Sequence, residues 1–112
     1  MEPAKHNLTI YRQRDFCKDF TFVDEEGELI PIDSWTFKSQ IRSTQCQEGT
    51  LLAEFTIDIN IPYSTITLNL SDTETQQLEE GTYFWDLLAE MNGCDNNLME
   101  GKVKVLCTVT EK

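Results

Sequence analysis

The sequence is poor in the residues that catalysis and phosphate binding commonly require. Its one histidine, His6, lies near the N-terminus, so a Ser-His-Asp or Cys-His arrangement would have to use a residue outside the expected core. From Ser43 to Gly101 there are eleven acidic residues and no lysine or arginine. Because basic side chains supply most of the nonspecific affinity for phosphate backbones, this distribution argues against binding to DNA or RNA. We therefore expect neither an enzyme nor a nucleic-acid-binding protein.

Long apolar runs are also missing. No stretch approaches the ~20 apolar residues of a membrane-spanning helix, and residues 1–7 contain no apolar run of signal-peptide length. We expect no membrane association, and we expect reduced cysteines because no export signal is visible. The cysteine spacing fits no zinc site, so no metal or other cofactor is expected. The alternative is a Cys17–Cys107 or Cys46–Cys94 disulfide if the folded protein meets an oxidising medium.

The composition is that of a folded domain with an acidic surface. The 112 residues are 39% hydrophobic and carry a formal net charge of −11, and a chain of this length can bury roughly two-thirds of its unfolded surface. The charge favours a solvated acidic surface. We predict a flexible N-terminal arm over residues 1–6, which are polar and include Pro3, and a single domain over residues 7–112.

Apolar and polar residues alternate through most of the chain, which predicts strands with one buried face. The expected strands cover residues 8–12, 16–23, 29–33, 35–42, 51–59, 65–70, 83–91 and 98–109. In the last of these, Cys107 alternates with valines and is expected to be a small core residue. Because no amphipathic helix of about 10 to 15 residues separates the strands, an antiparallel arrangement of two sheets fits better than an α/β fold.

Leu68 to Met91 is the segment around which we expect the fold to be organised. Ser71 and Glu74 have the spacing of a helix capping box, Leu78 would anchor the turn, and a buried strand carrying a tyrosine near its start follows. This layout is typical of immunoglobulin-like sandwiches. The predicted fold is therefore all-β, an immunoglobulin-like antiparallel β-sandwich of seven or eight strands, with one short helical turn near Ser71–Glu79.

The predicted strand registers place some large side chains outside the core. Trp35 and Trp85 fall on the inward side, whereas Tyr11 and Phe84 are the outward aromatics, and Lys102 and Lys104 stand on the outer face of the last strand. These four outward residues form our predicted partner-contact surface: Tyr11, Phe84, Lys102 and Lys104. The carboxylates of Asp86 and Glu90 are interpreted as part of a solvated face rather than as a glycosidase pair. The polar run at residues 95–97 is interpreted as a turn rather than as a calcium site.

Several segments together resemble a known family. They are LTIYRQRDF, DEEGELIPID, a strand ending in QIR, LLAEF, ITLNLSDTETQQLEEGTYFWDL and GKVKVLCTVT. This pattern, from about Asn7 to Thr110, resembles small bacteriophage virion proteins, in particular the immunoglobulin-like N-terminal domain of upper baseplate and tail-fibre-attachment proteins. Its most specific part is T-x-x-L-x-x-G-x-Y-x-x-D, here Thr75, Leu78, Gly81, Tyr83 and Asp86.

The resemblance implies a structural role without an active site. We expect a non-catalytic component of a tailed-phage virion, located in the tail, baseplate, neck or fibre attachment, that docks on other virion proteins in several symmetric copies. It would be assembled in the cytoplasm of the host bacterium. Family members continue into a helical or receptor-binding region, and this sequence departs from them by stopping after the sandwich. We therefore expect the domain to stand alone, docked on a larger assembly. The alternatives are a capsid decoration protein on the head surface and a carbohydrate-binding β-sandwich module.

Overall fold

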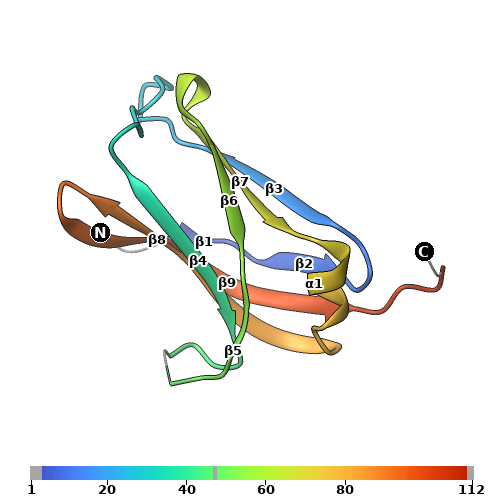
Figure 1. Ribbon diagram of the computed structural model, residues 1–112. Coiled ribbons are helices and arrows are strands. Elements are labelled where there is room, and N and C mark those ends of the chain that lie inside the picture. The colour runs from blue at the N-terminus through green and yellow to red at the C-terminus, as the bar shows by residue number, and fades with distance from the viewer. Residues whose placement is uncertain (1–3, 47, 111–112) are drawn as a thin grey trace.

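The computed structural model describes residues 4–46 and 48–110, and within them nearly all regular structure is β-strand (Figure 1). The nine strands of this part of the chain are β1 (Ala4–Lys5), β2 (Leu8–Tyr11), β3 (Phe16–Thr21), β4 (Thr36–Arg42), β5 (Leu51–Glu54), β6 (Thr56–Asn60), β7 (Thr65–Leu70), β8 (Gly81–Met91) and β9 (Cys94–Leu106). Two short helices interrupt them, the 3-10 helix η1 (Ile61–Tyr63) and α1 (Asp72–Gln76). Neither of these helices is long and apolar enough to cross a membrane.

The strands form two sheets that pack face to face. The large sheet has the order β1-β9-β8-β4-β5, with β2 also paired to β9, and the small sheet has the order β3-β7-β6. The strands β3, β7 and β6 thus correspond to B, E and D of the immunoglobulin fold, and β4, β8 and β9 to C, F and G. Pairing is antiparallel except where β1 and β2 run parallel to β9. The predicted immunoglobulin-like β-sandwich is confirmed.

Tyr83 makes the contact expected of a tyrosine near the start of strand F in this fold. Its phenolic hydroxyl donates a hydrogen bond of 2.8 Å to the backbone carbonyl of Glu79, which fixes the turn that enters β8. The capping box predicted before it is also confirmed. Glu74 N donates to Ser71 Oγ, and Ser71 N donates to Glu74 Oε1, so the helical turn at Asp72–Gln76 begins at the predicted residue.

The core lies between the two sheets and is filled by alternate residues of both. Its fully buried members from the central strands follow the predicted alternation: Ile41, Ile66, Leu68, Leu70, Leu87, Val103 and Val105. Trp85 is 3% exposed and its ring packs near those of Phe20 and Phe55. Trp35 is partly buried against the same core, beside Phe22 and Phe37. Both tryptophans therefore face inward, as predicted.

The run predicted as one strand over residues 51–59 is divided between the sheets. β5 pairs with β4 in the large sheet, and β6 pairs with β7 in the small sheet. The change of sheet occurs at Phe55, which is 4% exposed and donates its backbone N–H to the carbonyl of Ser39. Phe55 itself fills the core, so the alternation of apolar and polar residues continues from β5 into β6. The sequence pattern therefore gives no sign that the chain changes sheet here.

The N-terminal segment differs from the predicted loose arm of residues 1–6. Residues 1–3 lie outside the described part of the chain, but Ala4 and Lys5 pair with Met99 and Glu100 of β9. His6 N donates to the carbonyl of Glu100, and Lys5 Nζ lies 2.6 Å from Glu100 Oε2. The segment is polar because it lies at the edge of the large sheet, where a strand needs backbone partners more than apolar side chains.

The C-terminal strand also departs from its predicted bounds. A two-residue turn with positive φ at Asn92 and Gly93 joins β8 directly to Cys94, so residues 95–97 belong to β9 and not to a loop. β9 ends at Leu106. The prediction that Cys107 is a core residue is wrong, because Cys107 is exposed and its Sγ lies 3.0 Å from Glu80 Oε2. Cys17, Cys46 and Cys94 are exposed free thiols as well.

Candidate functional site

The four predicted contact residues come together on the outer face of the large sheet. Phe84 of β8 lies directly opposite Lys102 of β9. Lys104 lies two residues after Lys102 on β9, between Thr82 of β8 and Thr9 of β2. Tyr11 lies opposite Leu106 in the next outward-facing position. The residues come from the consecutive strands β8 and β9 and from β2, which is distant from them in sequence. Adjacent rows of the sheet bring them into one patch.

The patch faces outward because its neighbours in sequence are buried. Val103 and Val105 are fully buried on the inner face, so the period of two places Lys102 and Lys104 outside. Tyr11 is 50% exposed, Phe84 is half-buried and both lysines are exposed. We call Tyr11, Phe84, Lys102 and Lys104 the basic aromatic face. Within the described residues, no side chain forms a hydrogen bond or ion pair with either lysine ammonium group.

A shallow groove continues from Phe84 across the same sheet. Its volume is about 550 Å³, and its lining includes side chains of alternating character: Lys38, Gln40, Arg42, Phe84, Asp86, Leu88, Asn97 and Glu100. The register of the strands explains why polar and apolar side chains alternate along the groove. Asp86 lies between Gln40 and Glu100, and Leu88 lies between Lys38 and Asn97. The groove thus offers two apolar side chains flanked by hydrogen-bond donors and acceptors.

Asp86 is the group in this groove whose protonation is shifted. Partial desolvation of the carboxyl raises its pKa above the ordinary value, and the carboxylate of Glu100 across the ladder raises it further. The guanidinium of Arg42 opposes both effects. Arg42 is itself held by hydrogen bonds to the carbonyl of Gly49 and to Gln40 Oε1. The groove therefore holds an acid that is less readily ionised than a solvated aspartate.

The other residues considered from the sequence do not assemble a reaction centre. The ring of His6 packs edge-on against Phe20 with centroids 5.2 Å apart, and its backbone carbonyl accepts a bond from Trp85 Nε1. The carboxylate of Glu90 stands on the outer face of β8 opposite Thr36. Across residues 4–46 and 48–110, no three His, Cys, Asp or Glu side chains are grouped so as to hold a metal ion.

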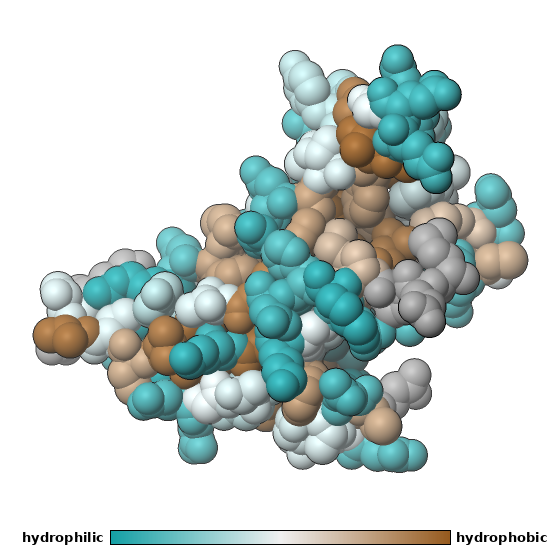
Figure 2. Space-filling model, turned by 180° about the vertical axis from the view of Figure 1, so that it is seen from behind, coloured by the Kyte–Doolittle hydropathy of each residue, from teal (hydrophilic) through white to brown (hydrophobic). Residues whose placement is uncertain are grey.

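A second surface, not anticipated from the sequence, lies at the end of the sandwich that carries η1. Five large apolar side chains are between 46% and 67% exposed there: Val23, Leu29, Ile59, Ile61 and Tyr63. The hairpin that holds Val23 and Leu29 joins η1 through a hydrogen bond from Phe22 N to the carbonyl of Ser64. We call these five residues the apolar end. Figure 1 shows both segments together at the top, and Figure 2 shows hydrophobic atoms there beside strongly hydrophilic ones.

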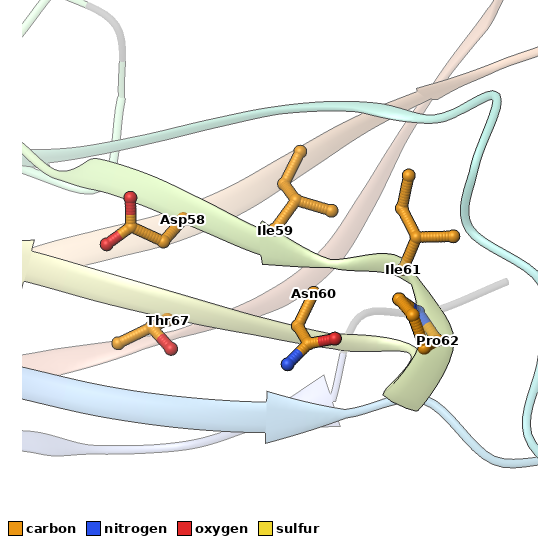
Figure 3. Close-up of a pocket in the computed structure, with 6 residues that line it drawn as sticks. All are labelled: Asp58, Ile59, Asn60, Ile61, Pro62 and Thr67. Atoms are coloured by element: carbon orange, nitrogen blue, oxygen red, sulfur yellow. The ribbon is translucent and has the colours of Figure 1, made fainter.

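A shallow hollow lies beside the apolar end. It is lined by Asp58, Ile59, Asn60, Ile61, Pro62 and Thr67 and is wide open to solvent. Figure 3 shows Ile59 and Ile61 pointing to the same side of the chain as β6 passes into η1. Ser64 ends η1 in the left-handed conformation with its N–H bonded to the carbonyl of Ile61, which turns the chain sharply and leaves the side chain of Tyr63 outside. The sequence Ile61-Pro62-Tyr63 could have indicated this exposed surface, because it places two large apolar residues in a turn.

The surroundings of the apolar end are acidic. The hairpin carries Asp24, Glu25, Glu26 and Glu28, and Asp58 lies on β6 beside the hollow. The sequence has no lysine or arginine between residues 19 and 37, nor between residues 43 and 101, and these ranges contain every residue of the apolar end. This end therefore combines exposed apolar area with a negative rim.

No protein-family model and no curated protein matches the sequence. Among solved structures, the chain is similar to the crystal structure of Listeria monocytogenes InlP, with 14% sequence identity and a TM-score of 0.48. The similarity covers 90% of this chain and 26% of that chain, so this chain spans about a quarter of the length of InlP.

Proposed function

We propose that this chain is a non-catalytic docking module and a structural component of a tailed-phage virion, placed in the tail, baseplate, neck or fibre attachment. The observation that carries the docking role is the basic aromatic face. Aromatic residues are enriched at protein interfaces because they bury a large area and lose little conformational entropy on binding. A rigid sheet presents Tyr11 and Phe84 beside two exposed lysines, which is a surface suited to a protein partner.

The assignment to a virion draws on the sequence resemblance, which extends from about Asn7 to Thr110. The motif residues Leu78 and Tyr83 have structural roles, as the buried anchor of the α1 turn and as the donor to Glu79. They therefore support a sandwich domain of this kind, and the virion role is inferred from the pattern as a whole.

Immunogold electron microscopy of phage particles tests the proposal. Antibody raised against the purified chain is applied to particles from lysates of the source culture, and preimmune serum is the control. Gold at the tail, baseplate or neck is the expected result. Gold distributed over the head would replace this assignment with the decoration role, and particles without gold would refute both virion roles.

The groove beside Phe84 favours a second candidate function, carbohydrate binding. Sugars bind to apolar side chains flanked by hydrogen-bonding groups, and the groove places Phe84 and Leu88 next to Asp86 and Asn97. A glycan array followed by titration calorimetry tests this candidate. Binding that disappears in Phe84→Ala and persists in Glu90→Gln, on the same face of β8, would support it. Titrations that show no sugar affinity would exclude it.

A further inference from the structure

The apolar end and the basic aromatic face have opposite charge and lie at opposite ends of the sandwich. β3 runs from Phe16, opposite Leu70 and next to α1, to Thr21, opposite Thr65 and next to η1. Tyr11 belongs to the α1 end, because the following residue, Arg12, donates from Nη2 to the carbonyl of Gln76. The two surfaces therefore do not overlap, and one molecule can use both at the same time.

Each surface has what the other lacks. The apolar end has five exposed large apolar side chains and the carboxylates of Asp24, Glu25, Glu26, Glu28 and Asp58. The basic aromatic face has the exposed ring of Tyr11, the half-buried ring of Phe84 and two exposed lysines. Within the described strands, the cross-strand rows Phe84–Lys102 and Thr82–Lys104–Thr9 contain no carboxylate. Lysine ammonium groups could thus meet the acidic rim while the aromatic rings cover the apolar side chains.

We propose that the partner of each surface is a second copy of this chain, with the apolar end of one copy docked on the basic aromatic face of the next. This inference rests on the docking function proposed above and names its partner. Two apolar ends cannot pair with each other symmetrically, since their acidic rims would be juxtaposed and like charges repel across an interface. The contact is therefore head-to-tail, and repetition of it produces a closed ring or an open filament.

Charge-swap variants test this contact with the purified chain alone. The acid-swap variant is Glu25→Lys with Glu26→Lys, and the base-swap variant is Lys102→Glu with Lys104→Glu. All four side chains are exposed, so both variants are expected to fold. Asp24 is left unchanged because its carboxylate caps the hairpin turn by accepting bonds from Glu26 N and Glu28 N.

Sedimentation velocity over a concentration series at low ionic strength measures the association. The wild-type chain is expected to associate, and added salt should weaken its association. Each swap alone should raise the apparent dissociation constant at least about tenfold. The base swap makes both surfaces negative, and the acid swap places two new lysines against Lys102 and Lys104 of the next copy. An equimolar mixture of the two variants should associate again, since each altered surface then finds an oppositely charged one. The control is Lys18→Glu, on β3 of the small sheet. It has the same net charge as a Lys102→Glu single variant but alters neither surface.

Zero-length cross-linking of carboxylates to amines, followed by mass spectrometry, identifies the atoms in contact. Cross-links that join Lys102 or Lys104 of one copy to Glu25, Glu26 or Glu28 of another support the proposal. A wild-type chain that stays monomeric at all concentrations overturns it, and so does a control variant that dissociates as much as the Lys102→Glu single variant. A monomeric chain that is nevertheless found on phage tails by immunogold would refute self-association and leave the virion role standing.

Discussion

The indole N–H of Trp85 donates a hydrogen bond of 2.8 Å to the backbone carbonyl of His6. This bond ties the N-terminal edge of the large sheet to the aromatic centre of the core, across 79 residues of sequence. The ring of His6 adds an edge-on contact to Phe20, which itself stacks near Trp85. The segment before β2 is therefore held by core residues as well as by its backbone pairing with β9.

Replacement of Trp85 by alanine should lower the free energy of unfolding by about 3 to 5 kcal/mol, because it removes a side chain that is only 3% exposed and leaves a cavity. Urea denaturation followed by circular dichroism measures the loss. Trp85→Phe is the matched control, since it keeps most of the packing and removes the bond to His6. A soluble Trp85→Ala variant with unchanged unfolding would show that Trp85 is not part of the core.

Gly101 has space for no side chain. A Cβ at this position would collide with the carbonyl oxygen of His6. Gly101→Ala should therefore push His6 away from β9 and cost about 1 to 3 kcal/mol of stability, the range for overpacked sites. Amide hydrogen exchange by NMR gives the local readout, because the His6 N–H that bonds to Glu100 should lose protection. Unaltered protection in Gly101→Ala would contradict this close approach.

The sequence was sufficient for the fold class because period-two alternation marks a buried face directly. It identified the inward register of β4, β7 and β8 and the capping box at Ser71 and Glu74. It did not locate the change of sheet at Phe55, because an apolar residue satisfies the alternation whichever sheet follows. It also missed β1, whose Ala4 and Lys5 are held by backbone pairing that leaves no hydrophobic pattern.

The candidate surfaces were predictable to different degrees. Tyr11, Phe84, Lys102 and Lys104 were found from strand register alone, because each lies next to a buried residue in a regular strand. The apolar end was not found, because four of its residues come from a hairpin and from η1, where no period applies. The fifth, Ile59, lies in β6, where its alternation is that of a buried strand residue although its side chain is exposed. Only the three-dimensional structure brings Val23 and Tyr63 to the same end of the sandwich.

The capping box of α1 provides a test that is independent of the core. Ser71→Ala removes the acceptor for Glu74 N and should destabilise the protein by about 1 kcal/mol, a typical value for loss of an N-cap. Thr73→Ala, at an exposed position on the same turn, is the matched control and should change stability little. Thermal unfolding measured by calorimetry compares the two. Equal losses for both variants would argue against a specific role for the cap.

Ionisation of Asp86 should lower the free energy of unfolding as pH rises through the acid range. Because its pKa is raised in the folded state, the native protein binds more protons than the unfolded chain between the two pKa values, so ionisation of Asp86 opposes folding. Asp86→Asn should therefore be more stable than the wild type at neutral pH. This advantage should shrink as pH falls through the ordinary aspartate range. Urea denaturation at a series of pH values measures it, and an advantage that is independent of pH would contradict the assignment.

Because β1 and β2 pair with β9, the N-terminal strands cannot join the large sheet until the C-terminal strand has been synthesised. The ribosome releases the N-terminal strands first, but their partner residues from Met99 to Leu106 emerge about a hundred residues later. Until then, Leu8 and Ile10 have no sheet to join, so the large sheet should close only after β9 has left the ribosome. A nascent chain arrested after Met91 should remain sensitive to protease, whereas one arrested with β9 fully outside the exit tunnel should be resistant.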